Sequence, residues 1–462
     1  MTTSVNGGAE SEAVSVTLNE LDVVATRGDA SITHSITVTE DPVRFIKATN
    51  PDQGDEFGAA IALSRDTLAV GAPFEDSDGS NETDNSVADS GAVYIFRRVN
   101  GDWTFEAYLK ANSPNQEDRF GASLSIDGDT LIVGAPGASL ETDPSNTTSG
   151  SGAVYVFQRV GATWNQQDFL KPQTADDDDG FGASVGFSDG RIVIGAPGED
   201  SAATRVDGTA TSNSSPSSGA AYVFEFSGTS WVQRAYLKSS NSDSGDSFGG
   251  SVAIDGEVIV IGASGEDSAA TEIDGDDGNT GTSVGAAYVF EMVSGDWQQT
   301  VYLKATSGQS GLVFGTSVCV APDVIAVGMP GREVSGAPEQ VGGVTIFQSE
   351  QNGWSRVGTR ADNQLTAGFF QGRNVDCSNT RVVVSADRDG PDVYDFNGGS
   401  WSSFDLSSPR RSSSSDLFAD NVALDGSSIV GGATREDSGA SFAAPDPADN
   451  SVSASGAVYV IE

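Results

Sequence analysis

Two segments of the sequence carry oxygen-bearing side chains at a spacing that suits a hard cation. One reads EDSDGSNETD from Glu75 and the other reads EIDGDDGN from Glu272. Carboxylates that alternate around a Gly let several oxygens converge on one ion, and Ca²⁺ takes about six to eight such ligands. Neither segment matches the complete EF-hand pattern, so solvated acidic loops are the competing interpretation. The candidate calcium ligands are Asp76, Asp78, Glu82, Asp84, Asp274, Asp276, Asp277 and Asn279.

Two shorter acidic motifs recur along the chain, and each has two interpretations. They form a ring of cation ligands, or they brace turns by accepting main-chain N–H bonds. One motif is an Asp two residues before a Phe-Gly pair; it recurs in copies with and without acidic loops, which favours the turn role. For the other motif, Glu-Asp-Ser, both interpretations stay open. The Glu-Asp-Ser motifs begin at Glu75, Glu199, Glu266 and Glu436, and the Asp residues are Asp55, Asp118, Asp179, Asp246 and Asp416.

Composition narrows the chemistry that the chain can support. Its 462 residues include one His and two Cys, too few for a multi-His zinc site, repeated Ser-His-Asp triads or a disulfide framework. Acidic pairs are so frequent that none stands out as general acid and base, and there is no phosphate-binding loop. We therefore expect that the protein is not an enzyme.

The charge of the chain restricts its partners. A net charge of −42, from 66 acidic and 24 basic residues, disfavours nucleic acid and anionic membrane surfaces and favours cations and basic surfaces. Such a surface is typical of halophilic proteins, because carboxylates hold water and cations while salt screens their mutual repulsion. Composition alone does not separate this interpretation from calcium binding.

An internal repeat defines the elements that must position these residues. Seven copies share a first part such as FGASLSIDGDTLIVGAP (Phe120 to Pro136) and a second part such as GAVYVF (from Gly152). In most copies a Trp and a strand such as EAYLKA follow. All five lysines occupy one position of the repeat. The first parts begin at Phe57, Phe120, Phe181, Phe248, Phe314, Gln371 and Phe418.

Each copy contains four short apolar stretches separated by Gly, Asp and Asn turns, and no segment has a sustained helical period. This pattern predicts an all-β fold of four-stranded antiparallel meanders. Seven such units of about sixty residues predict a seven-bladed β-propeller. The Phe, Tyr and Trp positions that recur once per copy predict packing between blades.

The ends of the chain predict how the ring closes. The last copy stops after its third strand, at Glu462, whereas DPVRFIKATN (residues 41–50) matches the missing fourth strand, with Lys47 at the lysine position. The N-terminal segment should therefore complete the last blade. We expect residues 41–462 to form the propeller and residues 1–40 to be a polar leader or linker with some strand propensity.

The paired FG and GAP signatures resemble the FG-GAP repeat family, which includes the seven-bladed head of integrin α subunits. The resemblance covers roughly residues 41–462 and implies an extracellular or cell-surface propeller that binds proteins or matrix, often with calcium. One feature departs from the family. Its calcium sites are DxDxDG loops between the first two strands, where this sequence has tight turns such as IDGD, so that site is not carried over.

In an up-and-down meander the loops between second and third strands and those between fourth and first strands leave the same face. The long polar loops all connect second to third strands, so they crown one face of the ring, which we call the crowned face. In the integrin-like family it is the face that binds ligands. Three Asn-X-Ser/Thr sequons within these loops fit a secreted glycoprotein. The sequons are at Asn81, Asn146 and Asn213, and the loops are residues 74–90, 137–151, 198–218, 265–284, 331–341 and 435–455.

Other features leave alternatives open. Cys319 and Cys377 lie at neighbouring repeat positions on adjacent first strands, so both a disulfide and two free thiols are consistent with the sequence. No apolar run is long enough to cross a membrane. The N-terminus has neither a basic start nor an apolar core, so the chain is either cytoplasmic or the mature or trimmed form of an exported protein.

We therefore predict a monomeric, non-enzymatic binding or adhesion module, extracellular or at the cell surface. It presents the crowned face to a protein or glycan ligand, with calcium as a candidate cofactor. The alternatives are a carboxylate-based hydrolase or lyase and a structural spacer of the cell envelope. A buried acid with a raised pKa at the mouth of the central channel would favour the enzyme, whereas a solvated acidic crown would favour the binding module.

Overall fold

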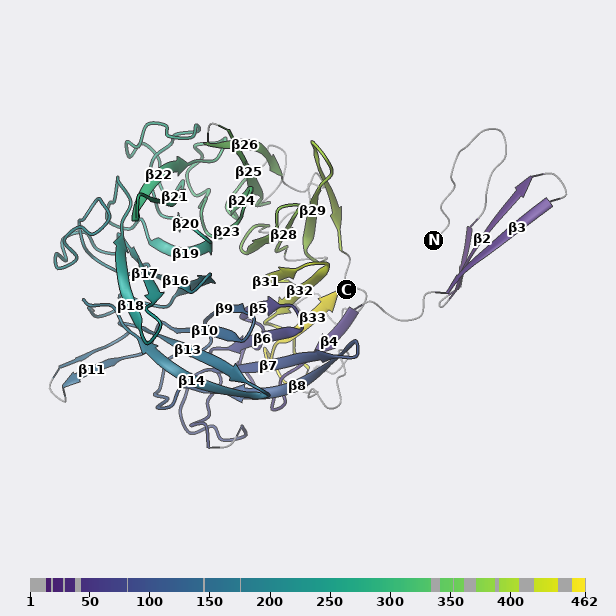
Figure 1. Cartoon of the computed structure of the whole chain (residues 1–462), viewed down its shortest axis with the longest axis horizontal. Helices are drawn as coiled ribbons and strands as arrows, with labels where there is room; N and C mark the ends of the chain where they lie inside the picture. Colours follow the sequence, from purple (N-terminus) through teal and green to yellow (C-terminus); the bar gives the residue numbers. More distant parts are fainter. Residues whose placement is uncertain are drawn as a thin grey trace. The chain divides into compact units, whose positions relative to one another are not determined.

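The computed structural model describes residues 14–17, 20–27, 30–37, 43–80, 82–143, 146–174, 176–333, 341–351, 353–360, 371–386, 390–406, 419–438 and 451–461. Residues 45–460 form one compact unit, which contains seven four-stranded antiparallel sheets arranged as the blades of a propeller (Figure 1). No α-helix occurs in the described ranges. The predicted seven-bladed, all-β fold is confirmed.

Each blade runs from an inner first strand to an outer fourth strand, and in blades one to six this is also the order of the strands along the chain. Blade one holds β5 (Ala60–Ser64), β6 (Thr67–Ala72), β7 (Ala92–Val99) and β8 (Asp102–Leu109). Blade two holds β9 (Ser123–Asp127), β10 (Thr130–Ala135), β13 (Ala153–Val160) and β14 (Thr163–Leu170). Blade three holds β15 (Ser184–Ser188), β16 (Arg191–Ala196), β17 (Ala220–Phe226) and β18 (Trp231–Leu237). Blade four holds β19 (Phe248–Asp255), β20 (Val258–Ala263), β21 (Ala286–Val293) and β22 (Asp296–Leu303).

The last three blades have the same order. Blade five holds β23 (Val318–Ala321), β24 (Val324–Gly328), β25 (Val344–Glu350) and β26 (Gly353–Arg360). Blade six holds β27 (Val375–Cys377), β28 (Arg381–Val384), β29 (Asp392–Phe396) and β30 (Trp401–Asp405). Blade seven holds β31 (Asn421–Asp425), β32 (Ser428–Ala433), β33 (Ala457–Ile461) and β4 (Val43–Ile46).

Blade seven closes the ring as the sequence predicts. Its strand order is β31-β32-β33-β4, so the outer strand comes from the N-terminal part of the chain. Because β4 pairs with β33, the third strand of blade seven is not left as a free edge.

Two smaller sheets lie outside the seven blades. In the N-terminal part of the chain, β1 (Val14–Thr17), β2 (Glu20–Arg27) and β3 (Ala30–Thr37) form a three-stranded antiparallel sheet. The strand propensity noted for this segment thus corresponds to strands. In the loop between the second and third strands of blade two, β11 (Leu140–Asp143) pairs with β12 (Asn146–Thr148).

The signature glycines allow adjacent blades to meet at the backbone. Gly219 adopts φ +79°, and a Cβ placed there would lie 2.1 Å from the carbonyl oxygen of Phe248 in the next blade. A Cβ on Gly195, in the GAP turn, would lie 1.9 Å from the carbonyl oxygen of Gly249. Only Gly permits both approaches. The FG and GAP signatures are therefore the two sides of one inter-blade contact.

The recurring aromatic residues fill the space between blades. The ring of Phe57 lies 5.3 Å from that of Tyr94 and 6.2 Å from that of Phe96, both in edge-on orientation. Phe57 is buried in the same cluster as Val458 and Val460 of blade seven. The prediction that these positions mark inter-blade packing is confirmed.

A disulfide joins Cys319 of β23 to Cys377 of β27, with a Cα–Cα distance of 5.9 Å. This resolves the two alternatives that the sequence left open. The bond links the inner strands of blades five and six. It crosslinks residues that are 58 positions apart in the sequence, so it restricts the unfolded chain substantially.

Candidate functional site

The crowned face is the end of the propeller where the connections between second and third strands meet those between fourth and first strands. The main-chain N–H groups of Gly54 and Glu56, in the connection after β4, donate to the carbonyls of Ser453 and Ala454 before β33, both at 3.2 Å. The expected loop positions are confirmed for the described residues, because residues 73–91 join β6 to β7 and residues 197–219 join β16 to β17. Residues 334–340, 387–389 and 439–450 of the other loops lie outside the described residues.

The base of the crown contains a buried ion pair that repeats in four blades. The Glu of each Glu-Asp-Ser motif contacts the Lys at the end of the fourth strand of the same blade. Burial is nearly complete; in blade seven both side chains are 0% exposed. The pairs are Lys47–Glu436 at 3.0 Å, Lys110–Glu75 at 2.9 Å, Lys238–Glu199 at 3.0 Å and Lys304–Glu266 at 2.6 Å.

Blade three shows how one lysine holds both ends of its loop. The Nζ of Lys238 donates to the Oε2 of Glu199 and to the carbonyl of Ser201, which lie where the loop begins. It also donates to the Oγ of Ser218 at 2.8 Å and to the carbonyl of Gly219 at 2.7 Å, where the loop ends. Burial lowers the pKa of Lys238, while the neighbouring Glu199 acts in the opposite direction.

The second residue of Glu-Asp-Ser braces the far end of the loop. In blade one the Oδ1 of Asp76 accepts the N–H of Asp89 at 2.8 Å. Equivalent bonds join Asp200 to Ser217 and Asp267 to Ser283. The residues that donate these N–H groups have positive φ angles, so each carboxylate fixes a turn that is otherwise uncommon for a residue with a side chain.

These contacts decide between the two interpretations of Glu-Asp-Ser. Its Glu does bind a cation, but the cation is an ammonium group of the same chain. The carboxylate of Glu266 also accepts bonds from the Tyr302 hydroxyl at 2.7 Å, from the Asn241 amide and from the Ser268 N–H. The motif is therefore part of the scaffold that holds the loops. The sequence shows the recurring Glu-Asp-Ser motif and the recurring Lys, but sequence reasoning missed that the Glu and the Lys pair with each other. A signal was present, because Glu-Asp-Ser occurs only in copies whose fourth strand carries a Lys.

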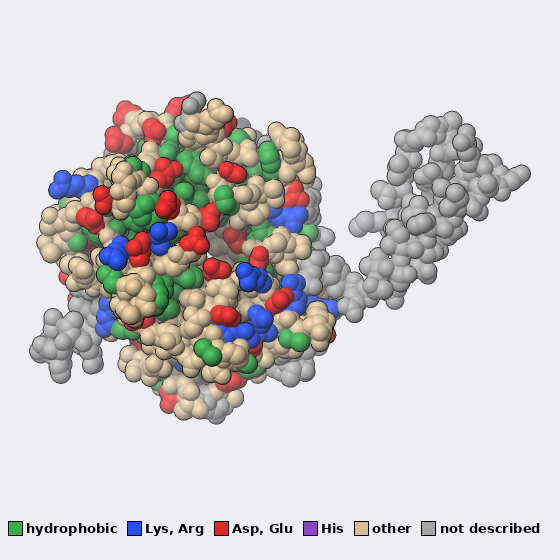
Figure 2. Space-filling model, in the orientation of Figure 1, with side chains coloured by type: hydrophobic (Ala, Val, Ile, Leu, Met, Phe, Trp, Pro, Cys, Tyr) green, Lys and Arg blue, Asp and Glu red, His purple; other side chains and the backbone are tan. Residues whose placement is uncertain are grey.

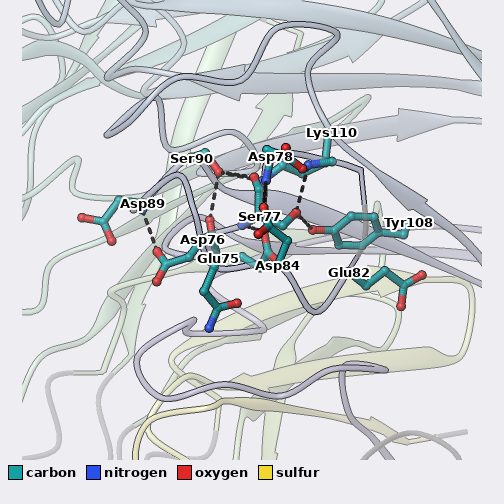
Figure 3. Close-up of polar contacts among 12 residues, drawn as sticks. Glu75, Asp76, Ser77, Asp78, Glu82, Asp84, Asp89, Ser90, Tyr108 and Lys110 are labelled. Carbon is teal, nitrogen blue, oxygen red and sulfur yellow. Dashed lines mark hydrogen bonds and ion pairs between the residues drawn. The ribbon is translucent and has the colours of Figure 1, made fainter.

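Three of the four predicted calcium ligands of blade one, Asp76, Asp78 and Asp84, are used within their own loop (Figure 3). Asp76 braces Asp89, as described above. The Oδ1 of Asp78 accepts the N–H of Ser80 at 2.7 Å. The Oδ2 of Asp84 accepts the N–H of Asp78 at 3.2 Å. The Oε2 of Glu82 accepts the hydroxyl proton of Thr49 at 2.7 Å, from the neighbouring connection. The four carboxylates thus point to four different partners.

The predicted ligands of blade four are solvent-exposed, and three of them have identified partners. Asp274 exchanges two bonds with Tyr302, since its N–H donates to the Tyr302 carbonyl at 2.9 Å and its Oδ1 accepts the Tyr302 N–H at 2.8 Å. This pairing covers the edge of β22. Asp276 accepts the N–H of Gly278 at 3.1 Å, and the Asn279 amide donates to Asp243 at 2.9 Å. Asp277 is exposed.

The positions of these carboxylates can be compared with what a calcium site requires. Among the residues that the structure describes, there is no group of three or more His, Cys, Asp or Glu side chains arranged to hold one ion. A calcium site built from these loops would need their carboxylates to turn away from the present partners. Calcium binding therefore stays a prediction.

The Asp before each FG pair has the predicted turn role. Asp246 is 2% exposed and its Oδ2 accepts the N–H of Asp243 at 2.8 Å. Burial raises the pKa of Asp246 to about 7, with a further contribution from the charge on Glu266. Asp55 and Asp179 have equivalent bonds and the same raised pKa of about 7. Asp416 lies outside the described residues.

The central channel is a concave region of the propeller, with a volume of about 440 Å³. First strands of all seven blades line it, and Figure 2 shows both acidic and basic side chains on the face around it. The only charged residues in the described lining are Arg373 and Asp376. Burial raises the pKa of Asp376 to about 6. Both of its carboxylate oxygens accept main-chain N–H groups, from Cys377 at 2.8 Å and from Leu424 at 2.7 Å.

The predicted glycosylation sites are only partly described. Asn213 is exposed in the loop of blade three, and Asn146 lies in β12. Asn81 lies outside the described residues. No helix in the described part of the chain is long and apolar enough to cross a membrane.

Comparison with known protein families identifies the repeat. A family model described as FG-GAP repeat matches residues 44–96, 103–157, 164–224 and 231–290. The first match begins in β4 of blade seven and ends in β7 of blade one, so the sequence repeat is offset by one strand from the structural blade. This offset produces the closure of the ring by the N-terminal strand. No curated protein matches the chain.

Proposed function

The chain is an FG-GAP repeat β-propeller, and from this premise we propose that it is a non-enzymatic binding or adhesion module that acts outside the cell or at its surface. FG-GAP repeats are typical of extracellular and surface proteins, and the Cys319–Cys377 disulfide suits an oxidising compartment. The ligand docks on the crowned face. The observation that carries the proposal is the contrast within the loops of blades one, three and four: the base is held by a buried ion pair, whereas the outer part is polar and mostly exposed.

This contrast is clearest in blade four. Lys304 and Glu266 are buried at the loop base, whereas Asp274, Asp276 and Asp277 at the tip are exposed. Loops held on a rigid scaffold are where binding functions concentrate, because clamping the base reduces the entropy lost on binding. A solvated acidic crown is the arrangement expected of a binding module.

The charge of the chain favours a basic protein surface as the ligand. A net charge of −42 attracts basic partners over long distances and repels polyanions, including acidic glycans. Glycan recognition requires a neutral sugar in this field. We expect binding to weaken as salt rises, since the Debye length falls from about 10 Å at 0.1 M to about 3 Å at 1 M.

The enzymatic alternative has one observation in its favour, the raised pKa of Asp376 in the channel wall. However, general acid–base catalysis needs a carboxyl group that can exchange its proton with a substrate. The two oxygens of Asp376 are engaged by the main chain of blades six and seven. This arrangement favours a structural role for Asp376, in which its carboxylate links two blades, over a role as a catalytic acid.

Charge-neutralising variants on the two faces test the proposal. The crown variant combines Asp274→Asn, Asp276→Asn and Asp277→Asn. The matched control removes the same charge from turns on the opposite face, with Asp127→Asn, Glu257→Gln and Asp296→Asn. With polylysine as the basic probe at 0.1 M salt, we expect the crown variant to bind about tenfold more weakly than the control, from roughly 0.5 kcal/mol per charge. Equal affinities would refute the crowned face as the binding surface.

The role of calcium is tested separately. Dedicated sites predict saturable binding of Ca²⁺ in calorimetric titration at low salt, with loss of binding in an Asp76→Asn, Asp274→Asn double variant. Stabilisation that rises smoothly with any salt would instead identify the acidic loops as solvated, salt-screened surface.

A further inference from the structure

Blade two breaks the ion-pair pattern at the base of the crown. Its GAP turn continues as GAPGAS (residues 134–139), whereas blade three has GAPGED (residues 195–200). Ala138 therefore stands where Glu199 stands in blade three. The lysine is retained, because Lys171 ends the fourth strand of blade two as Lys238 ends that of blade three. Blade two has the cation of the pair without the carboxylate.

The surroundings of Lys171 differ accordingly. Lys238 is 1% exposed, whereas Lys171 is only partly buried. No hydrogen bond or ion pair of Lys171 occurs within the described part of the chain; its Nζ lies 4.5 Å from the ring centroid of Phe169. In blade three this ring position is Tyr236, whose hydroxyl donates to Glu199. Blade two therefore lacks both the carboxylate and the hydroxyl that supports it.

An ammonium group in this position is poorly compensated. Burial lowers the pKa of Lys171, and no charge of a described residue offsets this effect. Partial removal of water from a charge costs free energy unless a partner of opposite charge replaces the water. In four other blades the partner is a carboxylate of the chain. In blade two a carboxylate from outside can take this role, because part of Lys171 is accessible from the crowned face.

We infer that Lys171, together with the ring of Phe169 and the short side chain of Ala138, forms a site on the crowned face for a carboxylate of the ligand. The overall charge of −42 selects the kind of ligand. It repels polyanions, so the carboxylate belongs to an Asp or Glu side chain that is flanked by basic residues of a protein partner. This inference rests on the proposed function in that both assign the ligand to the crowned face.

Lysine-specific NMR provides a direct test, because the chain contains only five lysines. The probes are two peptides, acetyl-Lys-Glu-Lys-amide and acetyl-Lys-Gln-Lys-amide, which differ only in the carboxylate. The intact protein is labelled with ¹³C-lysine and titrated with each. We expect the Glu peptide to shift the Cε signal of Lys171 and to bind about tenfold more tightly than the Gln peptide, the ratio that a charge-assisted hydrogen bond supplies. Equal affinities, or no shift at Lys171, would overturn the inference.

Two variants complete the test. Lys171→Met should abolish the preference for the Glu peptide. Ala138→Glu should abolish it as well, because the new carboxylate would pair with Lys171 as Glu199 pairs with Lys238, and this variant should also have a higher melting temperature. A preference that survives in both variants would place the carboxylate elsewhere. Binding of polylysine to the crown does not involve Lys171, so its retention separates failure of this inference from failure of the proposed function.

Discussion

The buried ion pair of blade three gives the sharpest prediction about what holds the crown together. Lys238→Met would remove an ammonium group that makes four hydrogen bonds and is 1% exposed, leaving the carboxylate of Glu199 in a site that is 4% exposed. Removing one partner of a buried pair costs about 3–5 kcal/mol, because the remaining charge has lost its compensation. We expect the free energy of unfolding to fall by this amount.

Two further variants separate the ion pair from a general effect of losing a lysine. Lys171→Met is the matched control, because Lys171 occupies the same repeat position and has no acidic partner within the described ranges; its cost should stay within about 1 kcal/mol. The double variant Lys238→Met, Glu199→Leu removes both charges and should recover most of the loss, since apolar replacement of a buried pair is often neutral.

Urea unfolding followed by circular dichroism, together with calorimetric melting temperatures, would measure these differences. The propeller, residues 45–460, has an unfolding entropy of about 0.9 kcal/mol/K, so a loss of about 3–5 kcal/mol corresponds to a fall in melting temperature of roughly 3–6 °C. The coupling energy follows from the double-mutant cycle. The reasoning fails if Lys238→Met is no more destabilising than Lys171→Met, or if the losses from the two single changes at Lys238 and Glu199 simply add.

Three more predictions concern closure, pH and the disulfide. Deletion of residues 41–50 should lower the melting temperature sharply, because it removes β4 and the blade-seven ion pair; an unchanged melting temperature would refute closure by the N-terminal strand. Burial raises the pKa of Asp246 to about 7, so its contribution to stability is present below its unfolded pKa of about 4 and is lost as pH rises through 7. Asp246→Asn should therefore stabilise the protein more at pH 8 than at pH 5, and the opposite pH trend in melting temperature would contradict this. Reduction of the Cys319–Cys377 bond should cost about 4 kcal/mol for a crosslink of this span, whereas a Cys319→Ser, Cys377→Ser variant should not respond to reductant; equal sensitivity in both proteins would show that the bond contributes nothing.

The fold was predictable from the sequence because the same pattern of strands and turns recurs in seven copies. The spacing of FG, GAP and GAVYVF signatures predicts the strands, their number and the offset that closes the ring. The physical reason is local: Gly is required where the next blade approaches the backbone, as at Gly195 and Gly219. Most copies therefore carry Gly at these two positions, although blade six has Ser385 and Pro391 there.

Some local roles were predictable for the same reason. An Asp that precedes a turn accepts an N–H group only a few residues away, so Asp246 and its equivalents were assigned correctly from sequence spacing alone. The recurrence of Lys at one position was equally visible. The spacing did not identify the partner of that lysine, because Glu199 and Lys238 are 39 residues apart and come into contact only when the meander folds.

The sequence by itself therefore determined the seven-bladed propeller, the strand that closes it and the face on which the long loops gather. Only the tertiary structure decided that Cys319 and Cys377 are bonded, that the Glu of Glu-Asp-Ser neutralises a buried lysine, and that Lys171 has no such partner among the residues the structure describes. The reason is that periodicity encodes contacts that recur at short range, whereas the state of a charge depends on which groups surround it in three dimensions.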